Sequence, residues 1–536
     1  MTQPTREPQA FLPPVASRGR SVGIVGILTL IVSGFGYLRE AALAARFGVS
    51  TTMDAYFGAI FIPNILYFIL IAGTLSPIFI PILLQDNADQ DRAKASETFS
   101  VVTTFVLLLL LILVACGLLT ASKWLPLLFA GFAPGTVQVT VRLIYIIFPA
   151  VLFLALSGIL TAALNGFHKF ALAAFVPALS SIAIMAAAFA ARGANAIYMV
   201  AAATASGFLL QAVFLVPAIA SLGLHFRPTL ALRHPAIKRL LRLGGPLLLY
   251  LLVANSAALL ERNLASRLSA GAVSTLTYAQ RLFLVPANFL AAPLAIVAYP
   301  LFASEALRQG RGNLANQVSR MFRLIVFLFF PIALWIILNA LPITRILYEH
   351  GRFLLADSLL TAWVLAIYGL GIVPNAVTII LLRCFFAIED TATPLLVELM
   401  SLVFFAVAAT LMTARWGITG LAISRCMAFS LVMGILIAVL WKRQRLLIFD
   451  SDLAGFLAKT VVASAGMGIV SWTSFHFLRP FFDSGATLLR LGIIVVVLAV
   501  SAATYLAFAR LFKVGEARQV MSTILGLVPG LSSGPN

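Results

Sequence analysis

The chain has 536 residues, of which 62% are hydrophobic and only 10% are charged, and its formal net charge is +19. A soluble domain has about 45–50% apolar and about 25% charged residues, so this composition excludes a water-soluble protein, a disordered chain and a disulfide scaffold. It indicates an all-α polytopic membrane protein. The three cysteines, Cys116, Cys384 and Cys426, lie in apolar stretches and are expected to be small core residues.

Apolar runs of about 20 residues, the length that crosses the hydrocarbon layer, recur along the chain. The proline-rich start up to residue 20 is expected to be a cytoplasmic tail, because the apolar run after it is too long for a signal peptide. Fourteen membrane-spanning helices are predicted, at 22–46, 54–84, 98–121, 137–163, 170–190, 196–222, 243–268, 273–303, 321–341, 357–384, 392–413, 418–441, 455–477 and 487–512.

Lys and Arg residues in the connections predict the orientation. With the N-terminus inside, 22 basic residues belong to the inner connections and 8 to the outer ones. This bias places both termini in the cytoplasm. The longest basic connection, 223–242, has Lys238, Arg239 and Arg242 along one helical side. It is either an amphipathic segment on the inner leaflet or a plain loop between two halves.

An internal repeat is visible when the sequence is shifted by 223 residues, so that 39–77 is compared with 262–300. Without any gap, an arginine, a glycine and two prolines coincide. The pairs are Arg39 with Arg262, Gly48 with Gly271, Pro63 with Pro286 and Pro77 with Pro300. An offset of six spans returns the second copy to the same orientation, which predicts a parallel repeat about an axis along the membrane normal.

These patterns predict two six-helix lobes in parallel repeat plus two C-terminal helices. The expected divisions are a cytoplasmic tail at 1–20, an N-lobe of six spans at 21–222, a basic cytoplasmic linker at 223–242, a C-lobe of six spans at 243–441, two further spans within 442–512 and a cytoplasmic tail at 513–536.

Charged residues inside spans are expensive in lipid and are candidates for function. Arg39 and Glu40 lie in the first span, Glu261 and Arg262 in the seventh, and Arg281 in the eighth. Adjacent residues do not face each other on a helix, so each member of the two pairs is expected to find partners elsewhere. Arg281 has no acidic residue within one turn and favours an anionic ligand.

Two further charges inside spans and one acidic residue at the start of a span have local interpretations. Glu398 and Arg425 are expected to join neighbouring helices. Asp54 begins the second span and is either a helix N-cap or a gate residue. Arginine offers five fixed donors that match phosphate oxygens, and Arg39, Arg262 and Arg281 are expected to converge on a central cavity. The position of these cations therefore suggests transport of an anionic, phosphorylated amphiphile.

Sequence signals of an enzyme are absent. The chain has no G-x-x-x-x-G-K-[ST] loop and no H-E-x-x-H motif, and its five histidines have no metal-ligand spacing. We expect no catalytic residue, no metal, no cofactor and no nucleic-acid partner.

Four groups of residues resemble the MurJ/MviN family, which belongs to the multidrug/oligosaccharidyl-lipid/polysaccharide exporter superfamily. The resemblance covers about residues 20–515. The groups are Gly36-Tyr-Leu-Arg39 through Gly48 with Asp54-Ala55, Ile62-Pro63-Asn64, Gly73 and Pro81; Tyr278-Ala-Gln-Arg281-Leu with Pro286; Gly351-Arg-Phe353 with Phe386-Ala387, Asp390-Thr391 and Thr393-Pro394; and Gly417-Ile-Thr-Gly-Leu-Ala422.

The resemblance implies a flippase for lipid II, the undecaprenyl-pyrophosphate-linked peptidoglycan precursor, acting by alternating access in the bacterial inner membrane. By motif match, Arg39 and Arg281 are cavity cations and Asp54 lies at the outer gate. Arg262 is expected to join these substrate-binding cations, with Glu40 and Glu261 as gate residues or charge partners. Asp390 and Thr391 are either a cap or an ion site. The expected partners are a polyprenyl-pyrophosphate-linked saccharide, membrane lipids and cell-wall synthesis proteins, and the chain is expected to be monomeric.

The sequence departs from the family pattern at several cavity positions. Ser33, Tyr67, Phe68 and Ala72 stand where the family typically has arginines or an acidic residue. The alternatives are therefore a flippase for another lipid-linked oligosaccharide, such as an exopolysaccharide or O-antigen unit, and a non-transporting scaffold in cell-wall synthesis. An exporter of cationic drugs is disfavoured because it would need cavity carboxylates.

Overall fold

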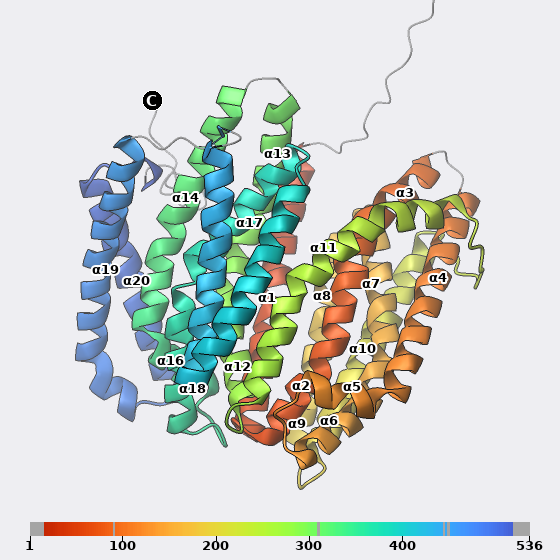
Figure 1. Ribbon diagram of the computed structural model, residues 1–536, viewed down its shortest axis with the longest axis horizontal. Helices are drawn as coiled ribbons and strands as arrows, with labels where there is room; N and C mark the ends of the chain where they lie inside the picture. The colour runs from red at the N-terminus through yellow and green to blue at the C-terminus, as the bar shows by residue number, and fades with distance from the viewer. Residues whose placement is uncertain (1–14, 89–91, 308–310, 443–444, 447–450, 518–536) are drawn as a thin grey trace, which may run out of the picture. The chain divides into compact units, whose positions relative to one another are not determined.

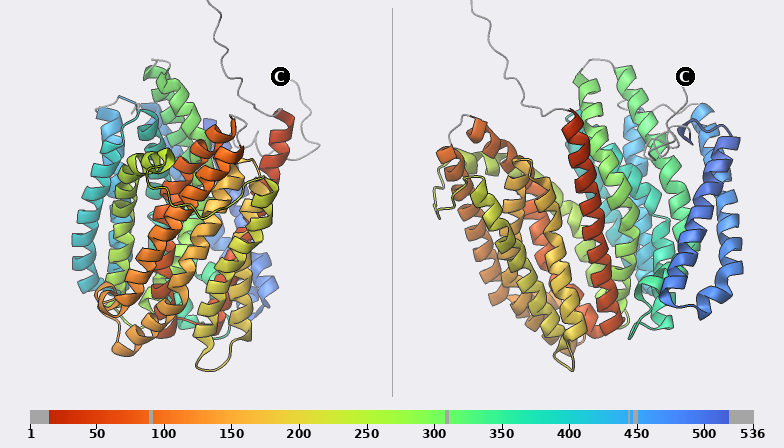
Figure 2. Two further views of the ribbon diagram at one scale, coloured as in Figure 1. Left: turned by 90° about the vertical axis from the view of Figure 1, so that its right-hand side faces the viewer. Right: turned by 180° about the vertical axis from the view of Figure 1, so that it is seen from behind.

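The computed structural model describes residues 15–88, 92–307, 311–442, 445–446 and 451–517, and all regular structure in this part of the chain is helical. Two compact units are formed (Figures 1 and 2). The first falls within Met1–Leu43, Ala59–Ala121 and Arg142–Leu248, and the second within Ala44–Gly58, Ser122–Val141 and Leu249–Asn536. The helices α1 (Val15–Phe47), α2 (Thr51–Tyr67), α6 (Pro134–Ile147) and α11 (Pro235–Ser266) are each divided between the two units.

The first unit is a helical bundle whose centre is α7. This helix packs against α3, α4 and α10, and the core between them contains Phe79, Phe99, Leu164 and Leu215, all buried. The helices that belong wholly to this unit are η1 (Phe68–Leu75), α3 (Ser76–Ala88), α4 (Arg92–Leu119), η2 (Phe148–Ala150), α7 (Val151–Gly166), α8 (Phe170–Phe175), α9 (Pro177–Ala190) and α10 (Ala196–Ser221).

The second unit contains most of the remaining helices. At one edge α19 and α20 lie side by side (Figure 1), and Phe482 and Val497 form a small core there with Ile346. Its helices are α5 (Ala121–Leu128), α12 (Ala272–Pro286), η3 (Ala287–Ala291), α13 (Ala292–Leu307), α14 (Arg311–Leu338), α15 (Ala340–Tyr348), α16 (Leu355–Gly369), α17 (Ile372–Ala387), α18 (Ala392–Lys442), α19 (Ser451–Ser484) and α20 (Thr487–Leu511).

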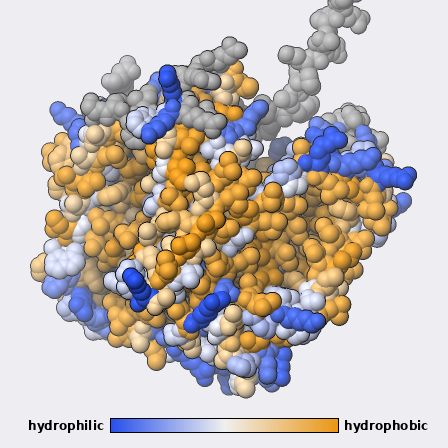
Figure 3. All heavy atoms as spheres, viewed as in Figure 1, coloured by the Kyte–Doolittle hydropathy of each residue, from blue (hydrophilic) through white to orange (hydrophobic). Residues whose placement is uncertain are grey.

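The structure confirms a polytopic all-α membrane protein. Among the described residues, 12 helices are long and apolar enough to cross a membrane, and α16 with α17, bent by 45°, makes a thirteenth candidate. On the face seen in Figure 3, hydrophobic residues cover the helices and hydrophilic ones gather near the helix ends. These exposed apolar side chains suit lipid tails.

The predicted number of fourteen stays a prediction, and α18 accounts for part of the difference. This helix of 51 residues contains the two predicted spans 392–413 and 418–441. A straight helix of that length would measure about 77 Å, more than twice the hydrocarbon thickness. Between the two spans, Gly417 has a non-helical backbone (φ 56°, ψ −133°), and a Cβ on Gly420 would meet the carbonyl oxygen of Met412. The chain therefore turns back on itself at Gly417.

Local features agree with the predicted repeat. Gly48 and Gly271 coincide in the repeat and both have positive φ, 61° and 88°. Pro63 lies inside α2 and Pro286 inside α12, and each of these helices passes into a π-helical segment, η1 and η3. The same backbone irregularity thus occurs at matched places in the two halves of the repeat.

The predicted lobe boundaries and tails stay predictions. Residues 1–14 of the first tail and 518–536 of the last lie outside the described residues, and α1 already begins at Val15. In the predicted linker 223–242, α11 begins at Pro235, so its last eight residues are helical. Lys238, Arg239 and Arg242 are exposed there, as is Leu241, while Ile237 and Leu240 are buried.

Substitution of Gly48 by alanine is expected to destabilise the chain by about 1–3 kcal/mol, because φ is positive and the new Cβ would lie 2.5 Å from the carbonyl oxygen of Arg352. Gly193→Ala is the matched control, since Gly193 has φ +73° but no heavy atom within 4 Å. Unfolding of both variants in mixed micelles measures the effect. An equal loss in the two variants would show that the close approach at Gly48 contributes nothing.

Candidate functional site

Asp54 lies in the first turn of α2, but its carboxylate caps a different helix, α12. The N–H groups of Gly271 and Ser274 donate to its two carboxylate oxygens, each at 2.7 Å, and Asp54 is only 3% exposed. Ser50 serves α2 instead, since its hydroxyl oxygen accepts from the N–H of Met53. The first N–H groups of a helix have no partner within that helix, and a buried carboxylate satisfies them. Asp54 therefore ties the start of α2 to the start of α12 within the second unit.

Three turns meet around Asp54, at residues 48–50, 268–272 and 349–353, and we name this region the Asp54 junction. The N–H of Arg352 donates to the carbonyl oxygen of Ala45 at 2.8 Å. Gly48, Gly271 and Gly351 all have positive φ, and a Cβ on Gly351 would meet the backbone of Ala45. Glycine is required here because backbones approach each other closely in a left-handed conformation.

Aromatic rings fill the interior of the Asp54 junction. Tyr278 of α12 lies at the centre, with its ring centroid 5.3 Å from that of Phe57, 4.9 Å from Tyr348 and 5.5 Å from Phe353. All four residues are buried. Such edge and tilted contacts add to the free energy of burial and exclude water from the carboxylate of Asp54.

The segment before α6 reaches the same end of the second unit. The side-chain amide of Asn263 donates to the carbonyl oxygens of Leu127 and Leu128, each at 3.0 Å, and the N–H of Gly131 donates to Ser266. The connections around residues 46, 123, 267 and 352, which the charge pattern assigns to one side of the membrane, therefore come together.

Arg262 is held inside the second unit by its own neighbours. Its guanidinium donates to the carbonyl oxygen of Val273 at 3.3 Å, to the hydroxyl of Thr277, and to the side-chain oxygen of Gln280 at 3.1 Å. Only 9% of Arg262 is exposed. All three acceptors belong to α12, so Arg262 fastens α11 to α12.

The hydrogen bonds continue from Gln280 to a buried carboxylate. The amide of Gln280 donates to the hydroxyl oxygen of Tyr368 at 3.2 Å, and the Tyr368 hydroxyl donates to Glu261 at 2.6 Å. Nε of Arg425 lies 3.9 Å from the second oxygen of Glu261. We call Arg262, Thr277, Gln280, Tyr368, Glu261 and Arg425 the α12 network, because it joins α11, α16 and α18 through α12.

Arg425 also lies over two aromatic rings. Its guanidinium carbon is 4.7 Å from the ring centroid of Phe429 and 5.4 Å from that of Phe405, and its side chain is 19% exposed. The sequence pairs Arg425 with Glu398, and the two do interact electrostatically. The contact with Glu261 comes in addition, and it fits the expectation that Arg425 joins neighbouring helices.

Arg39 and Glu40 pair with each other, a contact that the positions of adjacent residues on a helix did not predict. Nη2 of Arg39 lies 2.6 Å from the carboxylate of Glu40, whose side chain is 3% exposed. The long arginine side chain bends along α1 and reaches its neighbour, although the two Cβ atoms point in different directions. Arg39 keeps 20% of its side chain exposed.

Arg281 and Asp390 show how the remaining predicted residues lie. Arg281 is half-buried on α12, one residue after Gln280, and it repels Arg262 electrostatically. One oxygen of Asp390 accepts from the N–H of Thr393 at 2.9 Å and the other from its hydroxyl at 2.7 Å. This is the capping alternative, at the start of α18. An ion site with the exposed Thr391 stays a prediction, and among the described residues no group of three or more His, Cys, Asp or Glu could hold a metal.

The departures from the family pattern lie in the first unit. Tyr67 packs against the core formed around α7, and a Cβ on Gly158 would lie 2.7 Å from its ring. Ser33 and Ala72 are half-buried, and Phe68 is 47% exposed. Where the resemblance leads us to expect arginines, this chain therefore has Ser33, Tyr67 and Phe68, and Ala72 stands where an acidic residue is expected.

Thr277, Gln280 and Tyr368 were not found by sequence reasoning. Gln280 stands next to Arg281 in the quoted motif, and Thr277 lies one turn before Arg281, so a polar stripe on α12 was the available signal. Tyr368 lies 107 residues from Glu261 and gave no such signal.

The family profile described as "Lipid II flippase MurJ" matches residues 43–493. The chain belongs to this family. It is 28% identical over 500 residues to a probable lipid II flippase MurJ of Rhizobium tropici, covering 90% of this chain and 92% of the relative. It is 29% identical over 411 residues to the lipid II flippase MurJ of Burkholderia cenocepacia, covering 74% and 80%. Membership in a flippase family makes the chain a transporter and not an enzyme.

Solved structures support the same fold. The chain is similar to a lipid II flippase MurJ in an inward closed conformation, with a TM-score of 0.76, 23% identity and coverage of 91% of this chain and 98% of that one. It is also similar to an inward-facing MATE family multidrug resistance transporter of the MOP superfamily, with a TM-score of 0.63, 16% identity and coverage of 78% and 98%. These likenesses confirm the predicted helical fold.

Removal of the Asp54 carboxylate is expected to destabilise the chain. Asp54→Ala leaves two buried N–H groups without an acceptor and is expected to lower the free energy of unfolding by about 2–4 kcal/mol. Asp54→Asn keeps one acceptor oxygen and is expected to lose about half as much. Asp357→Asn is the control, because Asp357 accepts only one exposed hydrogen bond, from Leu354. Similar values for Asp54→Ala and Asp357→Asn, measured in mixed micelles, would contradict the cap.

The contact between Glu261 and Arg425 is expected to give a measurable coupling energy. In a double-mutant cycle of Glu261→Gln and Arg425→Gln, we expect the double variant to be about 1 kcal/mol more stable than additivity predicts, because each single change leaves a charge without its partner. The free energies of unfolding are measured as for Asp54. Additivity within about 0.3 kcal/mol would show that the two charges do not stabilise each other.

Proposed function

We propose that this chain moves lipid II from the inner to the outer leaflet of the bacterial cytoplasmic membrane by alternating access, with both termini in the cytoplasm. The observation that carries the proposal is the match of the family profile to residues 43–493. The excess of basic residues in the predicted inner connections supports the orientation.

The chemistry of the substrate explains why such a protein is needed. The pyrophosphate and saccharide of the headgroup would lose their water in the hydrocarbon layer, at a cost of several kcal/mol for each polar group. The polyprenyl tail can stay in lipid. A flippase therefore has to supply donors for the headgroup while the tail remains outside, and it has to expose those donors to one side at a time.

Arg39 and Arg281 are the proposed donors to the pyrophosphate. Arg39 keeps part of its side chain exposed although it pairs with Glu40, and Arg281 is half-buried. Two further candidate residues, Arg262 and Glu261, make hydrogen bonds within the second unit. Their proposed part is to set the position of α12, so that the neighbouring Arg281 is held in a fixed direction.

The Asp54 junction is the proposed outer gate. Its two hydrogen bonds to α12 are charge-assisted, and each is worth about 1.5–3 kcal/mol. Release of these bonds would let the turns at 48–50 and 268–272 separate. Glu40 would act as the charge partner of Arg39 when no substrate neutralises it.

The membrane potential can supply the energy. A pyrophosphate carries about two negative charges, and outward movement of each is favoured by about 2.3 kcal/mol per 100 mV when the inside is negative. The chain has no ATP-binding loop.

A flippase for another lipid-linked oligosaccharide is the second candidate, and the packing of Tyr67 favours it. A tyrosine packed against the core of the first unit stands where the resemblance leads us to expect an arginine. A changed set of cavity cations suits a changed headgroup. Cell-wall synthesis proteins are further proposed partners, and the chain is proposed to be monomeric. In a third candidate function, the chain does not transport a lipid and acts only as a scaffold for these proteins.

Complementation tests the proposal. In a bacterium depleted of its own lipid II flippase, the intact chain is expected to restore growth. Arg281→Ala is expected to lower flipping at least about tenfold, because one charge-assisted contact is lost. Arg415→Ala is the control, since Arg415 is an exposed arginine on α18. Flipping is measured with labelled lipid II, and immunoblotting checks the amount of each chain in the membrane.

The outcomes separate the alternatives. Rescue by the intact chain and Arg415→Ala but not by Arg281→Ala supports lipid II flipping through Arg281. Rescue by all three would remove Arg281 from the proposed site. If the intact chain reaches the membrane but does not rescue, lipid II is the wrong substrate, and Tyr67→Arg becomes the next variant to test for a gain of rescue.

A further inference from the structure

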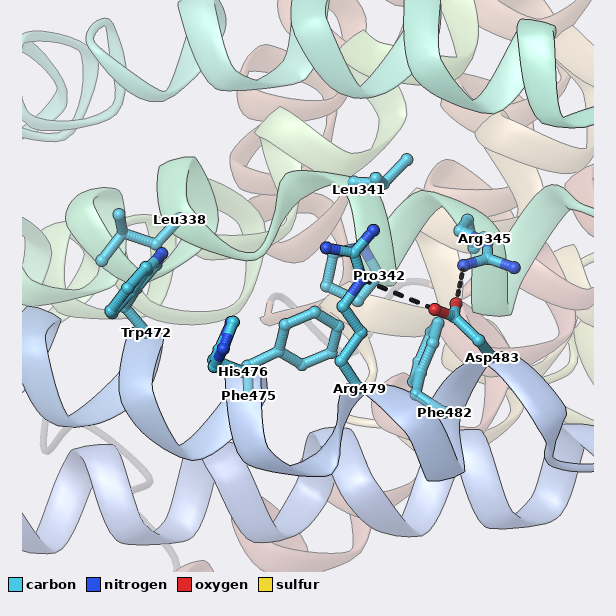
Figure 4. A pocket seen from close by; sticks show the side chains of 10 residues that line it. All are labelled: Leu338, Leu341, Pro342, Arg345, Trp472, Phe475, His476, Arg479, Phe482 and Asp483. Atoms are coloured by element: carbon cyan, nitrogen blue, oxygen red, sulfur yellow. Dashed lines mark hydrogen bonds and ion pairs between the residues drawn. The ribbon is translucent and has the colours of Figure 1, made fainter.

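A pocket of about 240 Å³ lies between α15 and α19 of the second unit, and none of its lining residues belongs to the Asp54 junction or the α12 network (Figure 4). One end is apolar and the other is charged. The apolar end is lined by Leu338, Leu341, Pro342, Trp472 and Phe475, and the polar end by His476, Arg479, Arg345 and Asp483, with Phe482 beneath them.

Arg345, which lines the polar end of the pocket, forms hydrogen bonds with two carboxylates. Its Nε donates to both oxygens of Glu349, at 3.1 and 2.9 Å, and its Nη1 donates to Asp483 at 2.5 Å. The guanidinium carbon lies 5.3 Å from the ring centroid of Phe482. Burial alone would lower the pKa of Arg345, but the bonds with these two carboxylates raise it above its ordinary value. Arg345 is therefore a fixed structural cation.

Arg479 makes a longer contact with a carboxylate than Arg345 does. Its Nε lies 3.5 Å from Asp483, and 65% of its side chain is exposed. Asp483 already accepts from Arg345, and Arg490 approaches Glu349 at 3.8 Å. Three arginines thus share two carboxylates, and the cluster keeps one excess positive charge. Arg479 presents that charge, since it is the most exposed of the three and lines the pocket (Figure 4).

The apolar end of the pocket has exposed hydrophobic side chains. The rings of Trp472 and His476 stack at 5.5 Å with an interplanar angle of 18°, and 60% of Trp472 is exposed. Leu338, on the opposite wall, is 39% exposed. A tryptophan near the end of a membrane helix marks the level of the headgroups, where an apolar ring and a polar tip suit the two sides of the interface.

We propose that this pocket binds the headgroup of an anionic glycerophospholipid. The phosphate lies against Arg479, the glycerol region passes His476 and the Trp472 ring, and the start of an acyl chain lies on Leu338. The excess charge matches the phosphate, and the apolar end matches the chain that must follow it. A guanidinium gives a phosphate paired donors, which explains an arginine at this position. The proposal is independent of the flipped substrate.

Binding of phosphatidylglycerol to the purified full chain tests the site. Native mass spectrometry compares it with phosphatidylcholine of the same acyl chains at equal concentration. We expect more phosphatidylglycerol on the intact chain and about a fivefold loss of occupancy in Arg479→Ala, the effect of one basic residue at a lipid surface. Arg415→Ala, which removes an exposed arginine of α18 outside the pocket, is expected to keep the occupancy.

Two further measurements distinguish binding of a lipid from binding of a free anion. Leu338→Asn removes the apolar wall and is expected to lower the occupancy as well. Inorganic phosphate, added as a competitor, is expected to displace little lipid. Equal occupancy in Arg479→Ala and Arg415→Ala would overturn the proposal, and so would full displacement by phosphate or an unchanged Leu338→Asn. Unfolding midpoints of all variants verify the fold, and Arg479→Gln replaces Arg479→Ala if the latter is unstable.

Discussion

A single buried carboxylate orders the second unit. Asp54 accepts from two N–H groups at the start of α12, and it does so from a segment more than 200 residues earlier in the chain. These donors lie beside a carboxylate that is only 3% exposed, so water does not satisfy them and the start of α12 requires an acceptor from the protein. The glycines at 48 and 271 allow the backbones to come close enough for this contact. The position of α12 follows from it, and so do the positions of the side chains that α12 carries.

The helix α12 links the junction to the buried charges. Thr277 and Gln280 accept from Arg262, and Gln280 in turn donates to Tyr368, which donates to Glu261. Each ionised group in this part of the unit thereby has a partner, as the low dielectric demands. Arg281 follows Gln280 directly and points about 100° further around the helix. The contacts that hold Gln280 consequently also fix the direction of Arg281.

Hydropathy and charge predicted the architecture because a membrane helix is defined by its length and apolarity. The π-helical segments η1 and η3 were not predicted, since they depend on local hydrogen bonding. The turn at Gly417, by contrast, lies between the predicted spans 392–413 and 418–441. The sequence offered a cap or a gate for Asp54, but only the fold tells which helix is capped. Arg262 was expected beside Arg39 and Arg281 as a donor to the substrate. Its acceptors, 11 to 18 residues later, come close only when α11 and α12 pack.

The Asp54 junction and the α12 network both lie within the second unit, so their hydrogen bonds hold the residues of one compact body together. Chain continuity does not distinguish them, because segment 44–58 and α11 both continue into the first unit. They differ in the part of α12 that they hold. Asp54 binds the N–H groups at the start of α12, whereas Arg262 and Tyr368 bind side chains on its later turns. The helix is therefore held at two levels along its length, and the direction of Arg281 depends on both.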